Sequence, residues 1–69
     1  MAAPEKAYFD AIREYLPYAT AKDIAEEVGV TRQGADWRLR QLEEEGKVKS
    51  EMVGNTRVWR LGPVALDSV

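Results

Sequence analysis

The 69-residue sequence contains no cysteine and no histidine. Disulfides, a thiol nucleophile, an imidazole base and the usual zinc sites built from these residue types are therefore excluded. The sequence also has no apolar run approaching the roughly 20 residues needed to span a bilayer. Its start, MAAPEKAYFD, lacks the cationic stretch and long apolar core of a secretory signal. We therefore expect a soluble, cytoplasmic protein with no metal, no cofactor and no membrane contact.

What remains is the composition of a small globular chain, with 45% hydrophobic and 32% charged residues. This length gives room for one domain, predicted over residues 1–69. The net charge is −2, but the positive charge is concentrated in two blocks. Residues 31–42 carry three basic and one acidic side chain, and residues 47–61 carry four basic and one acidic. The overall acidity argues against a protein that binds polyanions over its whole surface. The two basic blocks instead favour a local binding site for a polyanion.

Apolar residues at three- and four-residue spacing predict two helices in the first half of the chain. The first covers residues 4–16 and ends before Pro17, because a proline disfavours helical geometry at the residue before it. The second covers residues 21–28 and begins with a capping-box-like pair, Thr20 and Asp23.

A third helix is predicted over residues 32–45, after a corner of about three residues. It begins behind Thr31, a good N-cap. A step of about 100° per residue separates an apolar side from one that is polar, cationic and aromatic. The apolar side holds Ala35, Leu39 and Leu42, and the opposite side holds Gln33, Asp36, Trp37 and Arg40, with Arg32 and Arg38 at its shoulders.

The segment 47–61 predicts a two-stranded hairpin, because β-branched and aromatic residues flank the turn signal Gly54-Asn55. A lone hairpin is marginal in water, so alternate residues must pack against the helices, and Trp59 is expected among them. The remaining residues, 62–69, form a tail too short for another core element. Three helices followed by a hairpin make an α+β fold.

The order of these elements, and the strings IAEEVGVTRQGADWRLRQLEEEGKV and VGNTRVWRL within residues 24–61, resemble a winged helix-turn-helix DNA-binding domain of the small prokaryotic transcriptional regulator type. The run from Leu42 to Val48 is similar to the junction by which these proteins enter the wing. The resemblance implies a three-helix bundle with a helix-turn-helix and a hairpin wing. It also implies that the third helix enters the major groove of double-stranded DNA, while the wing reaches the backbone or the minor groove.

The candidate DNA-binding residues differ in chemistry. The forked donors of Arg40 and Gln33 suit guanine O6/N7 and adenine N6/N7. Arg32 lies in the first helical turn, where backbone N–H groups also face outward and suit a phosphate. Asp36 could accept from cytosine N4, or pair with Arg32 or Arg40 at four-residue spacing. The full set is Thr20, Lys22, Thr31, Arg32, Gln33, Asp36, Trp37, Arg38, Arg40, Lys47, Lys49, Asn55, Thr56 and Arg57.

Further roles follow from the resemblance and from position. As at matching positions in the family, Thr20 and Lys22 would hold the neighbouring phosphate strand. Arg57, beside the hairpin turn, would be the wing-tip cation, with Lys47 and Lys49 supporting it.

The sequence allows more than one role for two side chains of the third helix. Trp37, opposite the core, could touch a thymine methyl group, stack under a wing residue or sit in a dimer contact. Arg38 is expected to lay its stem over the edge of the core more than to read bases.

The resemblance implies sequence-specific binding of double-stranded DNA, as in a transcriptional regulator. The alternative is a protein–protein interaction module in a larger assembly, which the overall acidity and Trp37 favour. Recognition of RNA or of a left-handed duplex is a third option. An enzyme is not expected, because no residue set for chemistry is present. One small domain buries only ~600–1,000 Å² on DNA, so we expect a homodimer, at least on DNA, through the helix over residues 4–16.

Overall fold

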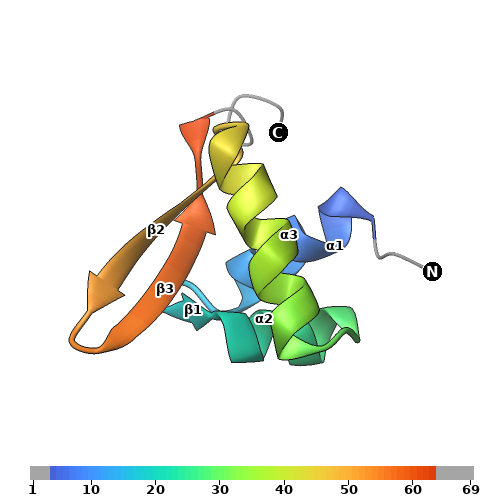
Figure 1. The fold of residues 1–69 in the computed structure, drawn as a ribbon, viewed down its shortest axis with the longest axis horizontal. Coiled ribbons are helices and arrows are strands. Elements are labelled where there is room, and N and C mark those ends of the chain that lie inside the picture. The colour runs from blue at the N-terminus through green and yellow to red at the C-terminus, as the bar shows by residue number, and fades with distance from the viewer. Residues whose placement is uncertain (1–3, 64–69) are drawn as a thin grey trace.

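The computed structural model describes residues 4–63, which form three helices and a three-stranded antiparallel sheet. Figure 1 shows helices α1, α2 and α3 gathered on one side, with the hairpin of β2 and β3 projecting from them. The predicted α+β winged-helix fold is confirmed. Most of the predicted tail over 62–69, namely residues 64–69, lies outside the described residues. None of the described helices has both the length and the apolar character needed to cross a membrane.

Helix α1 spans Glu5–Glu14 and is shorter than the predicted 4–16 at both ends. Pro4 is the N-cap, since its ψ of 154° is extended, and helical geometry begins one residue later. At the other end Tyr15 has left the helical region, with a φ of −108° and a ψ of 13°. Pro17 has no N–H to continue the hydrogen-bond pattern and disfavours helical geometry at the residue before it. The prediction that the helix reaches residue 16 is therefore wrong.

Helices α2, Ala21–Val28, and α3, Arg32–Glu44, form the helix-turn-helix. The capping box predicted at the start of α2 is confirmed, because the Asp23 N–H donates to the Thr20 hydroxyl at 3.2 Å and the Thr20 N–H donates to the Asp23 carboxylate at 3.5 Å. α2 ends at Gly29, whose φ of 87° is open to glycine without a steric cost. This tight corner fixes where α3 begins relative to α2.

Helix α3 ends one residue before the predicted boundary at 45. Glu45 is its C-cap, and the chain reverses at Gly46, which has a φ of 78°. The Gly46 N–H donates to the Glu43 carbonyl at 3.0 Å, and the next N–H, of Lys47, donates to the Leu42 carbonyl at 2.9 Å. These two bonds satisfy carbonyls that a helix end leaves without partners, so the hairpin starts directly after the helix.

The sheet has the strand order β1-β3-β2. Its strands are β1, Ala19–Thr20, β2, Val48–Val53, and β3, Thr56–Leu61. The hairpin is the predicted wing, but the expectation of only two strands is corrected to three. Strand β1 has two residues, too few to show the alternation of apolar and polar side chains that marks a strand in a sequence. It forms because Ala19 pairs with Trp59 and Thr20 pairs with Val58. This pairing holds the start of α2 beside the wing.

The core lies between the helices and the inner face of the sheet. The predicted apolar side of α3 is buried, since Ala35, Leu39 and Leu42 are all 0% exposed. Trp59 of β3 is also fully buried, as predicted. Each large apolar side chain removed from water contributes about 1.5–3 kcal/mol, which fixes the rotation of α3 about its axis. The polar side of α3 must then face outward.

Candidate nucleic-acid interface

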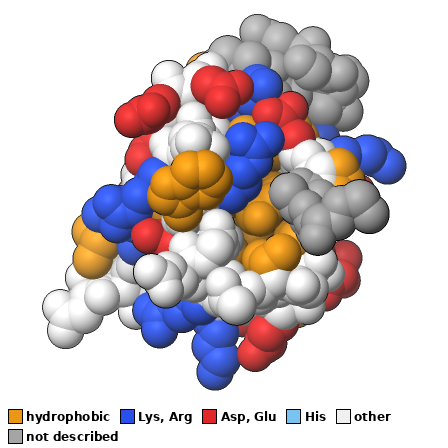
Figure 2. Space-filling model, turned by 45° about the vertical axis from the view of Figure 1, so that its right-hand side comes forward, with side chains coloured by type: hydrophobic (Ala, Val, Ile, Leu, Met, Phe, Trp, Pro, Cys, Tyr) orange, Lys and Arg blue, Asp and Glu red, His pale blue; other side chains and the backbone are white. Residues whose placement is uncertain are grey.

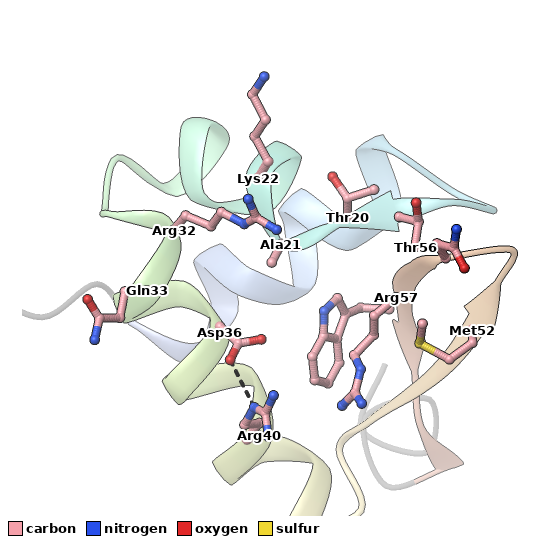
Figure 3. Close-up of a pocket in the computed structure, with 12 residues that line it drawn as sticks. Thr20, Ala21, Lys22, Arg32, Gln33, Asp36, Arg40, Met52, Thr56 and Arg57 are labelled. Carbon is pink, nitrogen blue, oxygen red and sulfur yellow. Dashed lines mark hydrogen bonds and ion pairs between the residues drawn. The ribbon is translucent and has the colours of Figure 1, made fainter.

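A concave site of about 840 Å³ lies between α3 and the hairpin, beside the junction of β1 and α2, and we call it the basic cleft. Figure 3 shows side chains of α3 and of the hairpin facing each other across it. Nine of the predicted DNA-binding residues line it, although the chain carries them in three separate segments. They are Thr20, Lys22, Arg32, Gln33, Asp36, Arg40, Asn55, Thr56 and Arg57.

The helical side of the basic cleft is positioned by the start of α3. The Thr31 hydroxyl accepts a hydrogen bond from the Gly34 N–H at 3.0 Å, which confirms Thr31 as the N-cap and places Arg32 in the first turn. In Figure 3, Asp36 and Arg40 project from α3 toward the hairpin. A helix N-terminus with an arginine beside it is suited to an anion.

The hairpin side of the basic cleft is set by strand register. Met52 of β2 is paired with Arg57 of β3, so both side chains lie on the same face of the sheet. Val48, in phase with Met52, is buried against the helices, so this face is the inner one. Figure 3 shows Arg57 extending into the space between the hairpin and α3. The register therefore directs Arg57 toward α3.

The basic cleft carries more positive than negative charge. Its four cationic side chains are Lys22, Arg32, Arg40 and Arg57, and its one carboxylate is Asp36. Arg40 Nε donates to Asp36 Oδ2 at 2.8 Å, which is one of the two pairings that the sequence spacing allowed. Within residues 4–63, the other three cations have no carboxylate oxygen within 4.0 Å, and all three are exposed. Exposed, unpaired cations in a concave site attract an anion.

Two predicted cations, Arg38 and Lys47, lie outside the basic cleft and are held by carboxylates. Lys47 Nζ is 2.7 Å from Glu5 Oε1 and 2.9 Å from Glu45 Oε1, and Arg38 Nη2 is 3.9 Å from the same Glu5 oxygen. Hydrogen bonds to Glu5 and Glu45 raise the pKa of Lys47 above its ordinary 10.5. We call these four residues the clasp. It joins the first turn of α1 to α3 and to the start of the hairpin.

The other three predicted residues lie on neighbouring surfaces. Lys49 is on the outer face of the sheet, because it alternates with the buried Val48. Thr31 and Trp37 line a second hollow along the exposed side of α3, which shares three residues with the basic cleft. Trp37 is 62% exposed, so its predicted position opposite the core is confirmed.

The basic cleft is also lined by three residues that were not predicted from the sequence, namely Ala21, Met52 and Trp59. The alternation that starts at the buried Val48 could have placed Met52 on the inner face. Trp59 was expected only as a core residue. Its indole Nε1 is buried without a hydrogen-bond partner among the described residues.

The acidic residues at the end of α3 lie apart from the basic cleft. Glu43 and Glu44 are in the last turn of α3, and Glu45 is its C-cap. In Figure 2, several acidic side chains lie near the top, the end at which α3 terminates in Figure 1, and others lie at the lower right, next to Lys and Arg side chains. A polyanion is therefore favoured toward the start of α3 and repelled at its end. No group of three potential metal ligands occurs among residues 4–63.

The helix-turn-helix, the three-stranded sheet and the basic cleft define a winged helix-turn-helix domain. Residues 17–49, just under half of the chain, match the family model described as winged helix-turn-helix DNA-binding. Comparison with curated protein sequences gives no match.

Two solved structures show the same fold. The structure of human N-acetylserotonin methyltransferase in complex with SAM has a TM-score of 0.80 and 21% identity, over 91% of this chain and 18% of that one. A variant of ZitR from Lactococcus lactis has a TM-score of 0.72 and 18% identity, over 99% of this chain and 49% of that one. The chain thus spans about a fifth and about half of these two proteins. At this identity the likeness is one of fold, and it transfers no activity.

Proposed function

We propose that the basic cleft binds double-stranded DNA with sequence preference, as the DNA-binding part of a transcriptional regulator. The observation that carries this proposal is the meeting of Lys22, Arg32 and Arg57 in one concave site, exposed and without carboxylate partners among the described residues. Three different elements supply these cations, and Figure 3 shows Arg57 in the space between the hairpin and α3, while Lys22 extends outward from the start of α2. The match of residues 17–49 to a model of DNA-binding domains supports DNA as the anion.

Helix α3 is suited to the major groove of B-DNA. Its 13 residues span roughly 20 Å, and the major groove, about 12 Å wide, admits a helix. Gln33, Asp36 and Arg40 lie on its outward side, which the buried face fixes. In the proposed complex these three side chains reach base edges, and the acidic C-terminal end of α3 stays away from the phosphates.

The remaining cations of the basic cleft contact the DNA backbone in the proposed complex. Arg32 and Lys22 lie in the first turns of α3 and α2, where unpaired backbone N–H groups add to the attraction for phosphate. Arg57 reaches the backbone or the minor groove from the wing. Arg38 and Lys47 do not contribute, because the clasp holds their charges against Glu5 and Glu45.

Two copies bound to one DNA site remain part of the proposal, because a single domain of this size buries too little surface for high specificity. The outer side of α1 is charged, with Lys6 and Arg13 both paired to Asp10. Two of the exposed large apolar side chains follow the end of α1, namely Leu16 and Tyr18, which are 50% and 60% exposed. Sedimentation mass on a duplex carrying one or two selected half-sites tests the dimer: one protein per duplex on both would contradict it.

A protein–protein interaction module is the second candidate, and the observation that favours it is Trp37, 62% exposed on α3. Large exposed indoles are frequent anchors at protein interfaces. In this case the cations of the basic cleft would have no phosphates to neutralise, and binding to DNA would be absent or independent of salt.

Binding of a random-sequence 20-bp duplex across a salt series separates the two candidates. Three or four phosphate contacts predict a slope of log Kobs against log[salt] of about −3 to −4. The charge-matched control is Lys6→Gln, which removes an exposed cation outside the basic cleft and leaves the slope unchanged. A flat response of the wild type contradicts DNA binding.

A further inference from the structure

The Asp36–Arg40 pair differs from the other charged groups of the basic cleft because it is already ordered. The bond from Arg40 Nε to Asp36 Oδ2 is 2.8 Å long and joins positions one helical turn apart. Arg40 remains 59% exposed and Asp36 36% exposed. Both side chains line the basic cleft and also the second hollow, so the pair stands at the centre of the outward surface of α3.

The atoms used in this bond decide what the pair can still bind. Arg40 donates through Nε, and neither of its Nη groups donates to any residue among 4–63. Two parallel N–H donors therefore stay available at the outer edge of the guanidinium. Asp36 accepts at Oδ2, and its Oδ1 receives no hydrogen bond from the described residues. The pair thus presents a double donor with an acceptor beside it.

A phosphate is a poor ligand for this pair, because the carboxylate repels it at short range. A base pair is uncharged, and the G·C pair offers the complementary pattern in the major groove. Guanine N7 and O6 are acceptors, which fit the two Nη groups, and cytosine N4–H is a donor, which fits the free carboxylate oxygen.

Fixing the arginine also lowers the entropy lost on binding. A free arginine side chain gives up rotamer freedom when it is held against a base. Arg32 and Arg57 have no such support among the described residues, which is adequate for a phosphate that can be met from many directions. Arg40 is held by Asp36 before DNA arrives (Figure 3).

We propose that Asp36 and Arg40 act as one recognition unit for a G·C base pair, in which Asp36 is a positioning residue for Arg40. This inference rests on the proposed DNA-binding function. The inference explains why a carboxylate, that of Asp36, lies in a surface that otherwise attracts phosphate. Asp36 weakens binding to any phosphate backbone and strengthens discrimination at one base pair.

The test is selection of bound oligonucleotides from a random duplex pool by the wild type and four variants. Arg40→Ala identifies the Arg40-dependent step, where the wild type enriches G·C and this variant does not. Asp36→Ala is expected to reduce the preference at the same step by about tenfold. Asp36→Asn keeps a neutral acceptor for Nε and is expected to retain more of the preference than Asp36→Ala.

Binding to random-sequence duplex separates positioning from charge. Asp36→Ala and Asp36→Asn remove the same negative charge, so both are expected to bind random duplex more tightly than the wild type. Glu26→Ala removes an exposed carboxylate of α2 outside the basic cleft and is the matched control, with unchanged preference. Thermal melting of each variant shows that it is folded.

Two results would overturn the inference, and both differ from a failure of the proposed function. If Asp36→Ala keeps the wild-type preference at the Arg40-dependent step, Asp36 does not position Arg40. If the wild type binds duplex with a steep salt slope but Arg40→Ala changes no base preference, the pair does not read a base. If the wild type binds no duplex at all, the proposed function itself fails.

Discussion

The basic cleft and the clasp contain the same kinds of cationic side chain in opposite states. In the basic cleft, Lys22, Arg32 and Arg57 are exposed and have no carboxylate within ion-pair distance among residues 4–63. In the clasp, Arg38 and Lys47 share Glu5, and their side chains are 31% and 27% exposed. The difference shows that the fold, and not the sequence alone, decides whether a positive side chain stays exposed and unpaired or is held by carboxylates.

The comparison also separates function from stability. Removing a cation from the basic cleft takes away an attraction for DNA and disturbs no ion pair of the described residues, except at Arg40. Removing one from the clasp breaks an ion pair with Glu5, and should affect folding more than binding.

The largest expected effect is that of Arg32→Ala/Arg57→Ala on DNA affinity. A slope of about −0.9 per phosphate contact corresponds to about eightfold in affinity per contact between 0.1 M and 1 M salt. Loss of both contacts should therefore weaken binding to a random duplex by roughly sixtyfold at 0.1 M salt. Fluorescence anisotropy across a salt series measures this, and the slope should become shallower by about 2. An unchanged slope would place the phosphate contacts elsewhere.

Thr31→Ala should have the next largest effect, since it removes the N-cap of α3. We expect a loss of about 1 kcal/mol in the free energy of unfolding, measured by urea denaturation. Because the first turn carries Arg32 and Gln33, duplex affinity should fall as well. Thr31→Ser retains the hydroxyl acceptor and serves as the control. Equal stability of the wild type and Thr31→Ala would show that the cap contributes nothing.

The clasp variant Arg38→Gln/Lys47→Gln tests the other side of the comparison. It should lower the free energy of unfolding by less than Thr31→Ala does, because partly exposed ion pairs contribute little each. Affinity for a random duplex should change by less than about threefold, since separate exposed charges are screened within about 10 Å at 0.1 M salt. Urea denaturation measures the stability, and fluorescence anisotropy measures the affinity. A loss of affinity like that of Arg32→Ala/Arg57→Ala would mean that the clasp opens to bind DNA.

The smallest effect concerns pH. The raised pKa of Lys47 means that the folded state favours its protonated form. This contribution is fully present below the ordinary pKa of 10.5 and is lost as the pH rises through the higher folded value. Between pH 9 and pH 12, the wild type should therefore lose more stability than Lys47→Gln. Comparing the two proteins removes the effect of Tyr15, whose pKa is also raised, chiefly by loss of solvent. Parallel pH profiles would contradict the assignment.

Features governed by local periodicity could be predicted from the sequence. The buried face of α3, the caps at Thr20 and Thr31 and the hairpin register follow from spacing within a few residues. The Asp36–Arg40 pair was one of two local possibilities. These features suffice to identify the fold and most residues of the basic cleft.

Features governed by distant contacts could not be predicted. Strand β1 has only two residues and depends on pairing with β3. The bond between Lys47 and Glu5 joins positions 42 residues apart, so no local pattern marks Lys47 as engaged. The spacing correctly placed Arg38 at the shoulder of α3, but its ion pair depends on where α1 packs.

Backbone amide chemical-shift mapping on addition of a random-sequence 15-bp duplex tests the central claim most directly, because it shows which of the two cationic regions meets DNA. We expect the largest shifts at residues 20–22, 31–40 and 52–57, which surround the basic cleft, and little change around Glu5 and Lys47. Largest shifts at the clasp, or no shifts at any residue under low-salt conditions, would contradict the claim.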